Sequence, residues 1–196
     1  MMCEPRLVLA SASPRRRELM DMTGIPYRID AADVDEHTTL GAREAVLELS
    51  RRKALAVAAR HPGLTVLGAD TLVAIDNTSL GKPATEAEAF AMLRMLSGRT
   101  HQVYTGVTVV AADGCVFSDV DTSHVTMNEL TDEEIRWYIA TGEPMDKAGA
   151  YALQGRACLW VREVRGTPSG VIGLPMPLTY RLLRQAGLSI LTVQGD

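Results

Sequence analysis

Three consecutive arginines, Arg15 to Arg17, follow a loop of small residues and open a predicted helix. The preceding run 7–10 predicts a buried strand, and Pro14 suits the first turn of a helix. The first amides of a helix are unpaired donors at the positive end of its dipole, so this segment could bind a phosphate. Cations are disfavoured at that end unless an anion docks there. The alternative is a solvated basic face on which Ser13 only caps the helix.

An aspartate, Asp70, interrupts the apolar run 65–75. A buried carboxylate needs a cation, backbone donors or a cleft. Glu36, Lys53 and Lys82 lie close enough in sequence to converge with it. A hydrolase that acts on a nucleotide needs oxygen ligands for Mg²⁺, a carboxylate for water and cations for the phosphates. The alternative is a turn aspartate beside a bulge, with the lysines on the surface.

A third segment, 146–155, is rich in small residues, which allow a backbone to approach a ligand closely. It contains Lys147 and Gln154. The amide of Gln154 could offer a donor and an acceptor to the edge of a base, or it could satisfy backbone groups of its own loop. The later segment 170–175 is interpreted as a turn and packing element.

Short apolar strands alternate with helical patterns, which indicates the α/β class. Thr131 with Glu134, and Thr85 with Glu88, have the spacing of capping boxes. The alternating segments on either side of 113–114 predict an antiparallel hairpin, so the sheet should be mixed. We expect strands near 6–11, 27–32, 65–75, 100–112, 115–126 and 157–165, and helices near 14–23, 42–60, 85–97, 131–141 and 175–186.

Composition limits the class of protein. With 196 residues, 46% of them hydrophobic and 22% charged, the chain can bury a core as one domain over 1–196, including one built as two lobes around a sheet. A net charge of −4 argues against nucleic acid or anionic membranes as partners. Cys3, Cys115 and Cys158 form no CxxC pair, which favours a reducing cytoplasm. No segment approaches the roughly 18 apolar residues of a membrane span.

Taken together, these segments resemble the Maf family of nucleotide pyrophosphatases over nearly the whole chain. The resemblance implies a metal-dependent enzyme that hydrolyses a nucleoside triphosphate between its α- and β-phosphates, and a homodimer. It also implies a mixed twisted sheet flanked by helices, with two lobes around a cleft, as in inosine triphosphate pyrophosphatases. The motifs that carry it are Ser11–Arg16, Val34–Glu36, Gly68–Thr71, Gly81–Pro83, Leu96–Val103, Asp146–Tyr151 with Gln154–Gly155, and Ile172–Pro175.

The resemblance assigns roles to individual residues. Asp70 matches the proton acceptor proposed for the family, and whether it acts as base or as metal ligand stays open. Asp70 and Glu36 are expected to hold Mg²⁺ or Mn²⁺. Lys53 and Lys82 are expected to act beside them in catalysis. The residues expected to bind substrate are Ser11, Arg15, Arg16, Thr71, Lys147 and Gln154.

The resemblance also indicates the nucleotide. Arg15, Thr71 and Gln154 match the branch that acts on dTTP and UTP, where CTP or modified pyrimidine nucleotides are further candidates. The branch that acts on 7-methyl-GTP has tryptophan, glutamine and glutamate at these places. Such a pyrophosphatase is one alternative. The other is a non-catalytic, nucleotide-binding regulator of cell division or septum formation, which would have little use for Asp70 and Glu36.

Overall fold

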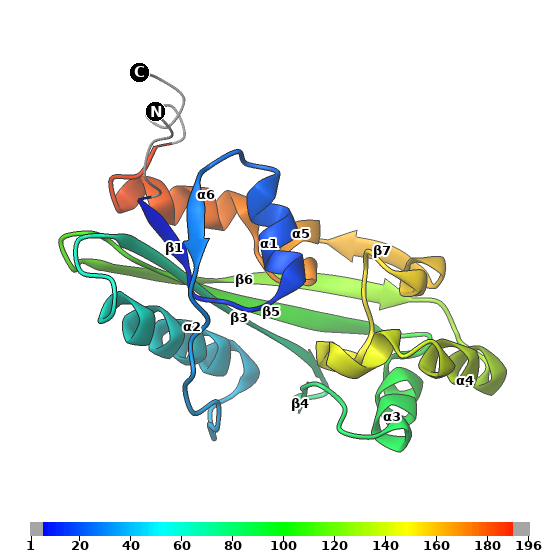
Figure 1. Ribbon diagram of the computed structural model, residues 1–196. Helices are drawn as coiled ribbons and strands as arrows, with labels where there is room; N and C mark the ends of the chain where they lie inside the picture. Colours follow the sequence, from blue (N-terminus) through cyan, green and yellow to red (C-terminus); the bar gives the residue numbers. More distant parts are fainter. Residues whose placement is uncertain (1–5, 190–196) are drawn as a thin grey trace.

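The computed structural model describes residues 6–189 and contains one twisted sheet of seven strands with helices on both faces (Figure 1). The strands are β1 (Leu7–Leu9), β2 (Tyr27–Ile29), β3 (Thr65–Ile75), β4 (Thr78–Leu80), β5 (Thr100–Val110), β6 (Val116–Met127) and β7 (Val161–Arg165). Their order is β2-β1-β3-β5-β6-β7, with β4 paired to β3. The β1 pairs are parallel and the others antiparallel, which confirms the expected mixed sheet.

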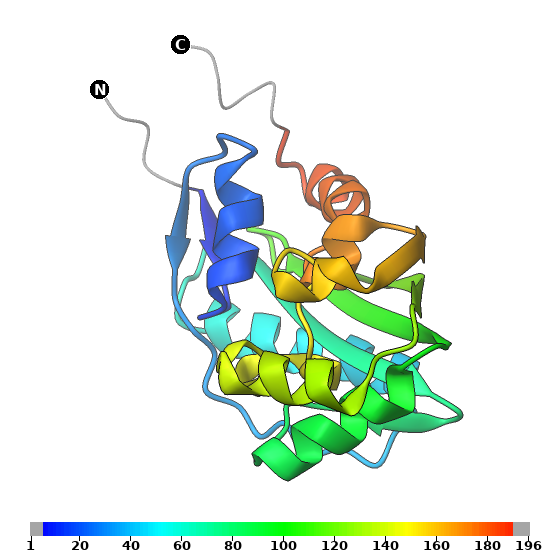
Figure 2. The same cartoon turned by 90° about the vertical axis from the view of Figure 1, so that its right-hand side faces the viewer.

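Helices cover the sheet unevenly. The α-helices are α1 (Pro14–Asp21), α2 (Ala42–Ala58), α3 (Glu86–Leu96), α4 (Asp132–Ala140), α5 (Pro168–Ile172) and α6 (Met176–Gln185). The short 3₁₀ helices are η1 (Glu143–Asp146), η2 (Ala148–Ala150) and η3 (Arg156–Leu159). In Figure 1, α2 lies along one face, while α1, α5 and α6 lie on the other. Figure 2 shows α3 and α4 together, away from α1 and α6.

The period of two along β3 divides the core between the two faces of the sheet. Val66 packs with Ala54 and Val57 of α2. Its neighbour Leu67 packs on the other face, in a cluster that includes Leu19 of α1 and residues of α6. The same alternation continues into the polar part of the strand.

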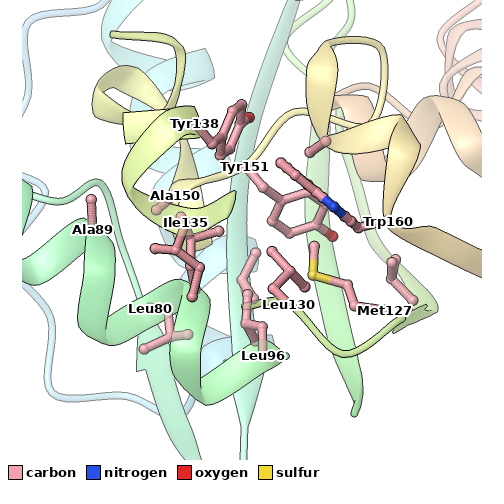
Figure 3. Close-up of a cluster of buried hydrophobic side chains, with 14 of the residues drawn as sticks. Leu80, Ala89, Leu96, Met127, Leu130, Ile135, Tyr138, Ala150, Tyr151 and Trp160 are labelled. Carbon is pink, nitrogen blue, oxygen red and sulfur yellow. The ribbon is translucent and has the colours of Figure 1, made fainter. Parts of the chain in front are cut away.

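A separate cluster of buried side chains forms the core beneath α3 and α4 (Figure 3). Figure 3 places Tyr138 and Trp160 toward one end of this cluster and Leu80 and Leu96 toward the other. The molecule therefore has two packed halves: α1, α6 and the start of β3 form one, and α3, α4 and the end of β3 form the other.

Most of the expected elements are present, with specific differences. The strand expected over 157–165 begins only at Val161, because Arg156–Leu159 form η3 after the turn at Gly155. The sequence analysis missed β4 and α5, which have three and five residues. Both are shorter than a hydrophobic period can reveal.

The expected helix caps differ in quality. Thr131 and Glu134 form a complete capping box. Thr85 accepts from the Glu88 amide, but the Glu88 carboxylate bonds the amide of Ala84, so the second box is incomplete. Ser13 occupies the N-cap of α1 without a side-chain cap bond, since its own amide donates to Ser11 Oγ.

Two further expectations concern the described residues as a whole. No helix within 6–189 is both long and apolar enough to cross a membrane. Cys115 and Cys158 are free and exposed, while Cys3 lies outside the described residues. The expected single domain covers 1–196, which extends beyond the described residues 6–189, so it stays a prediction.

Candidate active site

An unpaired stretch of β3 opens the sheet. β1 ends at Leu9, opposite Leu67, and β4 begins to pair only at Val73. Between these points, in the described sheet, this edge of β3 has no partner strand. Side chains from both faces of β3 can therefore reach the same opening, and Asp70 and Thr71 lie at its centre.

Asp70 lies on the face of β3 that α2 covers. Two glycines on this face bring α2 close to the sheet: Gly68, and Gly106, which pairs with Asp70. A Cβ on Gly106 would lie 2.2 Å from the Val46 carbonyl oxygen of α2, so only glycine fits there. The close approach brings Lys53 of α2 within reach of Asp70.

Lys53 joins the two predicted catalytic carboxylates. Its Nζ lies 2.6 Å from Asp70 Oδ1 and 2.7 Å from Glu36 Oε1. The side chains of Lys53 and Asp70 are only 11% and 10% exposed, whereas that of Glu36 is 62% exposed. Within residues 6–189, Asp70 Oδ2 has no hydrogen-bond partner, so this oxygen is available to a water or a metal ion.

The loop that carries Glu36 is tied to α2. Arg52 donates to the carbonyl oxygens of Asp35 and His37, at 3.2 and 3.1 Å. Burial opposes ionisation of Glu36, but the hydrogen bond from Lys53 and the charges of Lys53, Lys82 and Arg16 outweigh it and lower its pKa. Glu36 is therefore a carboxylate at neutral pH.

Arg16 occupies the opposite face, beside Thr71. Its guanidinium donates to the Gly173 carbonyl at 2.8 Å, to Ser11 Oγ at 3.1 Å and to Thr71 Oγ1 at 3.3 Å. Thr71 in turn bonds Thr105 Oγ1, at 3.0 Å. The late glycine segment, interpreted from the sequence as a turn and packing element, thus also contacts the site directly through the Gly173 carbonyl.

Within residues 6–189, no ion pair balances the charge of Arg16. Among the salt bridges of residues 6–189, none includes Arg16. Burial lowers its pKa, and the positive charge of Arg15 adds to this effect against the attraction of Asp70 and Glu36. A desolvated guanidinium without a paired carboxylate is a suitable partner for a phosphate.

Arg15 connects the two halves of the molecule. It lies on α1 and bonds Asp146 of η1, with Nη1 2.9 Å from Oδ2. Lys147 Nζ lies 2.5 Å from the other carboxylate oxygen. Burial opposes ionisation of Asp146, but the hydrogen bonds from Lys147 and Arg15 lower its pKa to about 2. Asp146 therefore holds two predicted substrate-binding residues, Arg15 and Lys147, at the cavity.

All of the predicted site residues line one open cavity of about 780 Å³. Lys82 and Gln154 are exposed there, and within 6–189 neither makes a hydrogen bond or ion pair. Arg17 does not line the cavity. The residues that the structure brings together are Ser11, Arg15, Arg16, Glu36, Lys53, Asp70, Thr71, Lys82, Lys147 and Gln154.

The donor set fits a divalent ion that arrives with a phosphate ligand. No group of three or more His, Cys, Asp or Glu side chains within 6–189 could hold a metal by itself. Mg²⁺ bound with a nucleotide typically takes one or two carboxylates and completes its shell with phosphate oxygens and water. Asp70 and Glu36, brought together by Lys53, supply such a pair.

The sequence analysis missed three residues that shape the site. Asp146 was visible in the 146–155 segment, but its link to Arg15 spans 131 residues. Thr105 is a buried threonine in a strand, with no local sign of its bond to Thr71. Glu143 stands between a glycine and a proline, which indicates only a turn. Their contacts depend on the tertiary fold.

Comparisons with known proteins agree on one family. Residues 6–186 match the family described as Maf-like protein. The dTTP/UTP pyrophosphatase of Symbiobacterium thermophilum is 48% identical over 189 residues, 95% of this chain and 97% of that protein. The dTTP/UTP pyrophosphatase of Myxococcus xanthus is 50% identical over 186 residues, 94% of each chain.

Among solved structures, the Staphylococcus aureus Ham1 protein aligns with a TM-score of 0.46 at 15% identity, over 62% of this chain and 71% of that one. This similarity is too low to support an inference about fold or function.

Proposed function

This chain belongs to the Maf family, and we propose that it is a pyrophosphatase that converts dTTP and UTP to their monophosphates and pyrophosphate. The names of relatives that share about half of its residues over nearly their full length support this substrate choice. CTP and modified pyrimidine triphosphates are further candidates because they share the pyrimidine ring.

The single observation that carries the proposal is the arrangement of charge around the opening in β3. Cations line it from both halves of the molecule, and no carboxylate of the described residues is paired with the guanidinium of Arg16. Asp70 lies among these cations with one carboxylate oxygen available. Cations bind and neutralise a triphosphate, and a carboxylate adds the group needed to activate water.

The proposed reaction is an attack by water on the α-phosphorus. A bond forms between the water oxygen and phosphorus, and the bond from phosphorus to the α,β-bridging oxygen breaks. Asp70 accepts the proton of the water through Oδ2, while Lys53 holds its Oδ1. Pyrophosphate leaves with the bonding electrons, and nearby cations stabilise its charge.

The cations divide into two groups. Arg16, with Ser11 and the first amides of α1, binds phosphate oxygens on one side of the cavity. Lys82 and Lys147 approach from the other side. A divalent ion, Mg²⁺ or Mn²⁺, held by Asp70 and Glu36 would neutralise phosphate charge and polarise the reacting phosphorus.

Gln154 is proposed to read the base. Its amide offers a donor and an acceptor, which suits the edge of thymine or uracil. Thr71 and Arg15 act indirectly, because Thr71 bonds Arg16 and Thr105, and Arg15 bonds Asp146. The proposal includes a homodimer, which the family resemblance implies, and a cytoplasmic location, which the cysteine usage favours.

A panel of triphosphates tests the proposed activity. dTTP, UTP, CTP and 7-methyl-GTP are incubated with the protein and Mg²⁺, and pyrophosphate and orthophosphate are measured separately. We expect pyrophosphate, fastest from dTTP and UTP, and loss of turnover in EDTA that added Mg²⁺ or Mn²⁺ restores. Preference for 7-methyl-GTP would refute the substrate choice. Binding without turnover of any substrate would favour a regulator.

A further inference from the structure

Gln154 stands on a tight turn that directs its side chain to the cavity. The Gly155 amide donates to the Ala152 carbonyl at 3.1 Å and closes the turn. Gln154 is exposed, lines the cavity and makes no hydrogen bond within the described residues. The backbone of the turn therefore sets the point from which the Gln154 side chain enters the cavity.

Tyr138 and Glu143 hold both ends of this turn. The Ala152 amide donates to Tyr138 Oη at 3.1 Å. The Arg156 amide donates to Glu143 Oε1 at 2.9 Å. Tyr138 Oη donates to the same Glu143 oxygen, also at 2.9 Å. One hydroxyl and one carboxylate thus connect the backbone on either side of Gln154.

Glu143 and Tyr138, which hold the turn, are themselves closely packed. A Cβ on Gly155 would lie 2.0 Å from Glu143 Oε1, so the carboxylate rests directly against the turn and a larger residue there would displace it. Tyr138 is completely buried, and its ring packs against that of Trp160 with centroids 5.5 Å apart. Figure 3 shows Tyr138 in the buried cluster with Tyr151 and Trp160.

Glu143 also reaches the phosphate side of the site. Its backbone carbonyl accepts from Lys147 Nζ at 2.8 Å. One residue therefore contacts both the proposed phosphate ligand and the turn that carries the proposed base reader. Neither Glu143 nor Tyr138 lines the cavity, so any effect on the substrate must pass through the residues they hold.

We propose that Tyr138 and Glu143 are positioning residues for substrate selection: they fix the turn so that the Gln154 amide meets the pyrimidine edge while the phosphates occupy their own subsite. This inference rests on the proposed reading of the base by Gln154. Loss of either link would let the turn shift, which weakens the contact with the base and leaves the contacts with the phosphates in place.

The test separates the base end from the phosphate end of the substrate. KM is measured for dTTP, and Ki is measured for inorganic tripolyphosphate, which carries phosphates and no base. For Tyr138→Phe we expect KM to rise about fivefold or more, because a buried amide and a carboxylate lose their partner. Ki should stay within about twofold of the wild-type value. Neither constant depends on the fraction of active enzyme, so simple destabilisation does not mimic this result.

Tyr27→Phe is the matched control. Like Tyr138→Phe, it removes a hydroxyl that makes two hydrogen bonds, here to Asp21 and to the Arg17 carbonyl. Tyr27 does not line the substrate cavity, and within the described residues its hydroxyl makes no hydrogen bond to the turn that carries Gln154. KM and Ki should both match the wild type. If Tyr138→Phe does not fold, Glu143→Ala decides, because it removes the acceptor of both the Tyr138 hydroxyl and the Arg156 amide; the same rise in KM for dTTP is expected.

Gln154→Ala distinguishes failure of this inference from failure of the proposed function. If Gln154→Ala leaves KM for dTTP unchanged, Gln154 does not read the base and both proposals fail at that point. If it raises KM while Tyr138→Phe and Glu143→Ala do not, only the positioning role is overturned. In the Gln154→Ala background, Tyr138→Phe should change KM by less than about twofold, since the two act through one contact. If Tyr138→Phe raised KM in this background as much as it does alone, the inference would be contradicted.

Discussion

Two adjacent side chains of β3 divide the proposed chemistry between them. Asp70 faces α2 and bonds Lys53, whereas Thr71 faces α1 and bonds Arg16. Because successive residues of a strand point to opposite faces, this division follows from the strand itself. The proposed base and the proposed phosphate ligand can therefore approach one substrate from different sides.

Replacing the proposed base should affect the chemical step. Asp70→Asn keeps the size of the side chain but removes the proton acceptor, so kcat for dTTP should fall by about 10² to 10⁴. Asp76→Asn is the matched control. Asp76 lies in the turn after β3, pairs with Arg99 and does not line the cavity. Near wild-type kcat in Asp70→Asn, with the fold intact by circular dichroism, would remove Asp70 from the mechanism.

A buried histidine should make stability depend on pH. His101 is fully buried, with Nε2 2.8 Å from Tyr151 Oη, and burial lowers its pKa to about 4. The unfolded chain takes up this proton near pH 6.5, the folded protein only near pH 4. The contribution of neutral His101 to the free energy of unfolding is therefore complete above about pH 6.5. As the pH falls toward 4, the free energy of unfolding decreases by about 3 kcal/mol.

Urea unfolding of the wild type and of His101→Gln between pH 4 and pH 7.5 measures this contribution. The difference in unfolding free energy between the two proteins should shrink as the pH falls. His124→Gln, at an exposed position on β6, serves as control. A difference that stays constant over the whole range would mean that His101 titrates alike in the folded and unfolded chains.

At the level of elements, the site depends on how closely α2 lies on the sheet. Gly68 and Gly106 have no side chains that would hold α2 away from the sheet. The buried hydroxyls of Ser50 on α2 and Thr108 on β5 therefore lie 2.9 Å apart. The same approach places Lys53 on Asp70. Packing and catalysis are thus coupled through two glycines that bind nothing themselves.

Gly106→Ala should separate α2 from β5. The added Cβ would meet backbone atoms of α2 that cannot move independently, so the unfolding free energy should fall by about 1 to 3 kcal/mol. Turnover should fall as well, because Lys53 shifts from Asp70. Gly41→Ala, where a Cβ meets only the tip of the Glu44 side chain at 3.0 Å, should cost less and leave turnover unchanged. Equal effects of the two substitutions would exclude this coupling.

Local sequence was sufficient for the long elements and insufficient for the short ones. The strand over 65–75 was predicted with its correct bounds, because a long apolar run leaves few alternatives. β4 follows a tight turn in which Asp76 and Asn77 have positive φ, and its three residues carry no period. The strand expected over 157–165 starts only at Val161, because η3 occupies Arg156–Leu159 and its apolar residues look like the beginning of the strand.

At the level of the whole molecule, the site lies where the two packed halves meet. Arg15 from one half bonds Asp146 from the other across the cavity. The sequence predicted which residues gather there through their motifs, but not that Asp146, Glu143 and Thr105 hold them. Asp146 and Thr105 act through contacts between distant segments, which neither composition nor periodicity encodes. Glu143 bonds Tyr138 and Arg156, which are nearer in the chain, through a turn whose course the local sequence does not show.

The central claim is that water attacks the α-phosphorus of dTTP within this cavity. Hydrolysis in water enriched in ¹⁸O, followed by mass spectrometry of the products, locates the new bond directly. We expect one ¹⁸O atom in thymidine monophosphate and none in the pyrophosphate. Label in the pyrophosphate, or release of thymidine diphosphate with labelled orthophosphate, would place the attack on the β- or γ-phosphorus and contradict it.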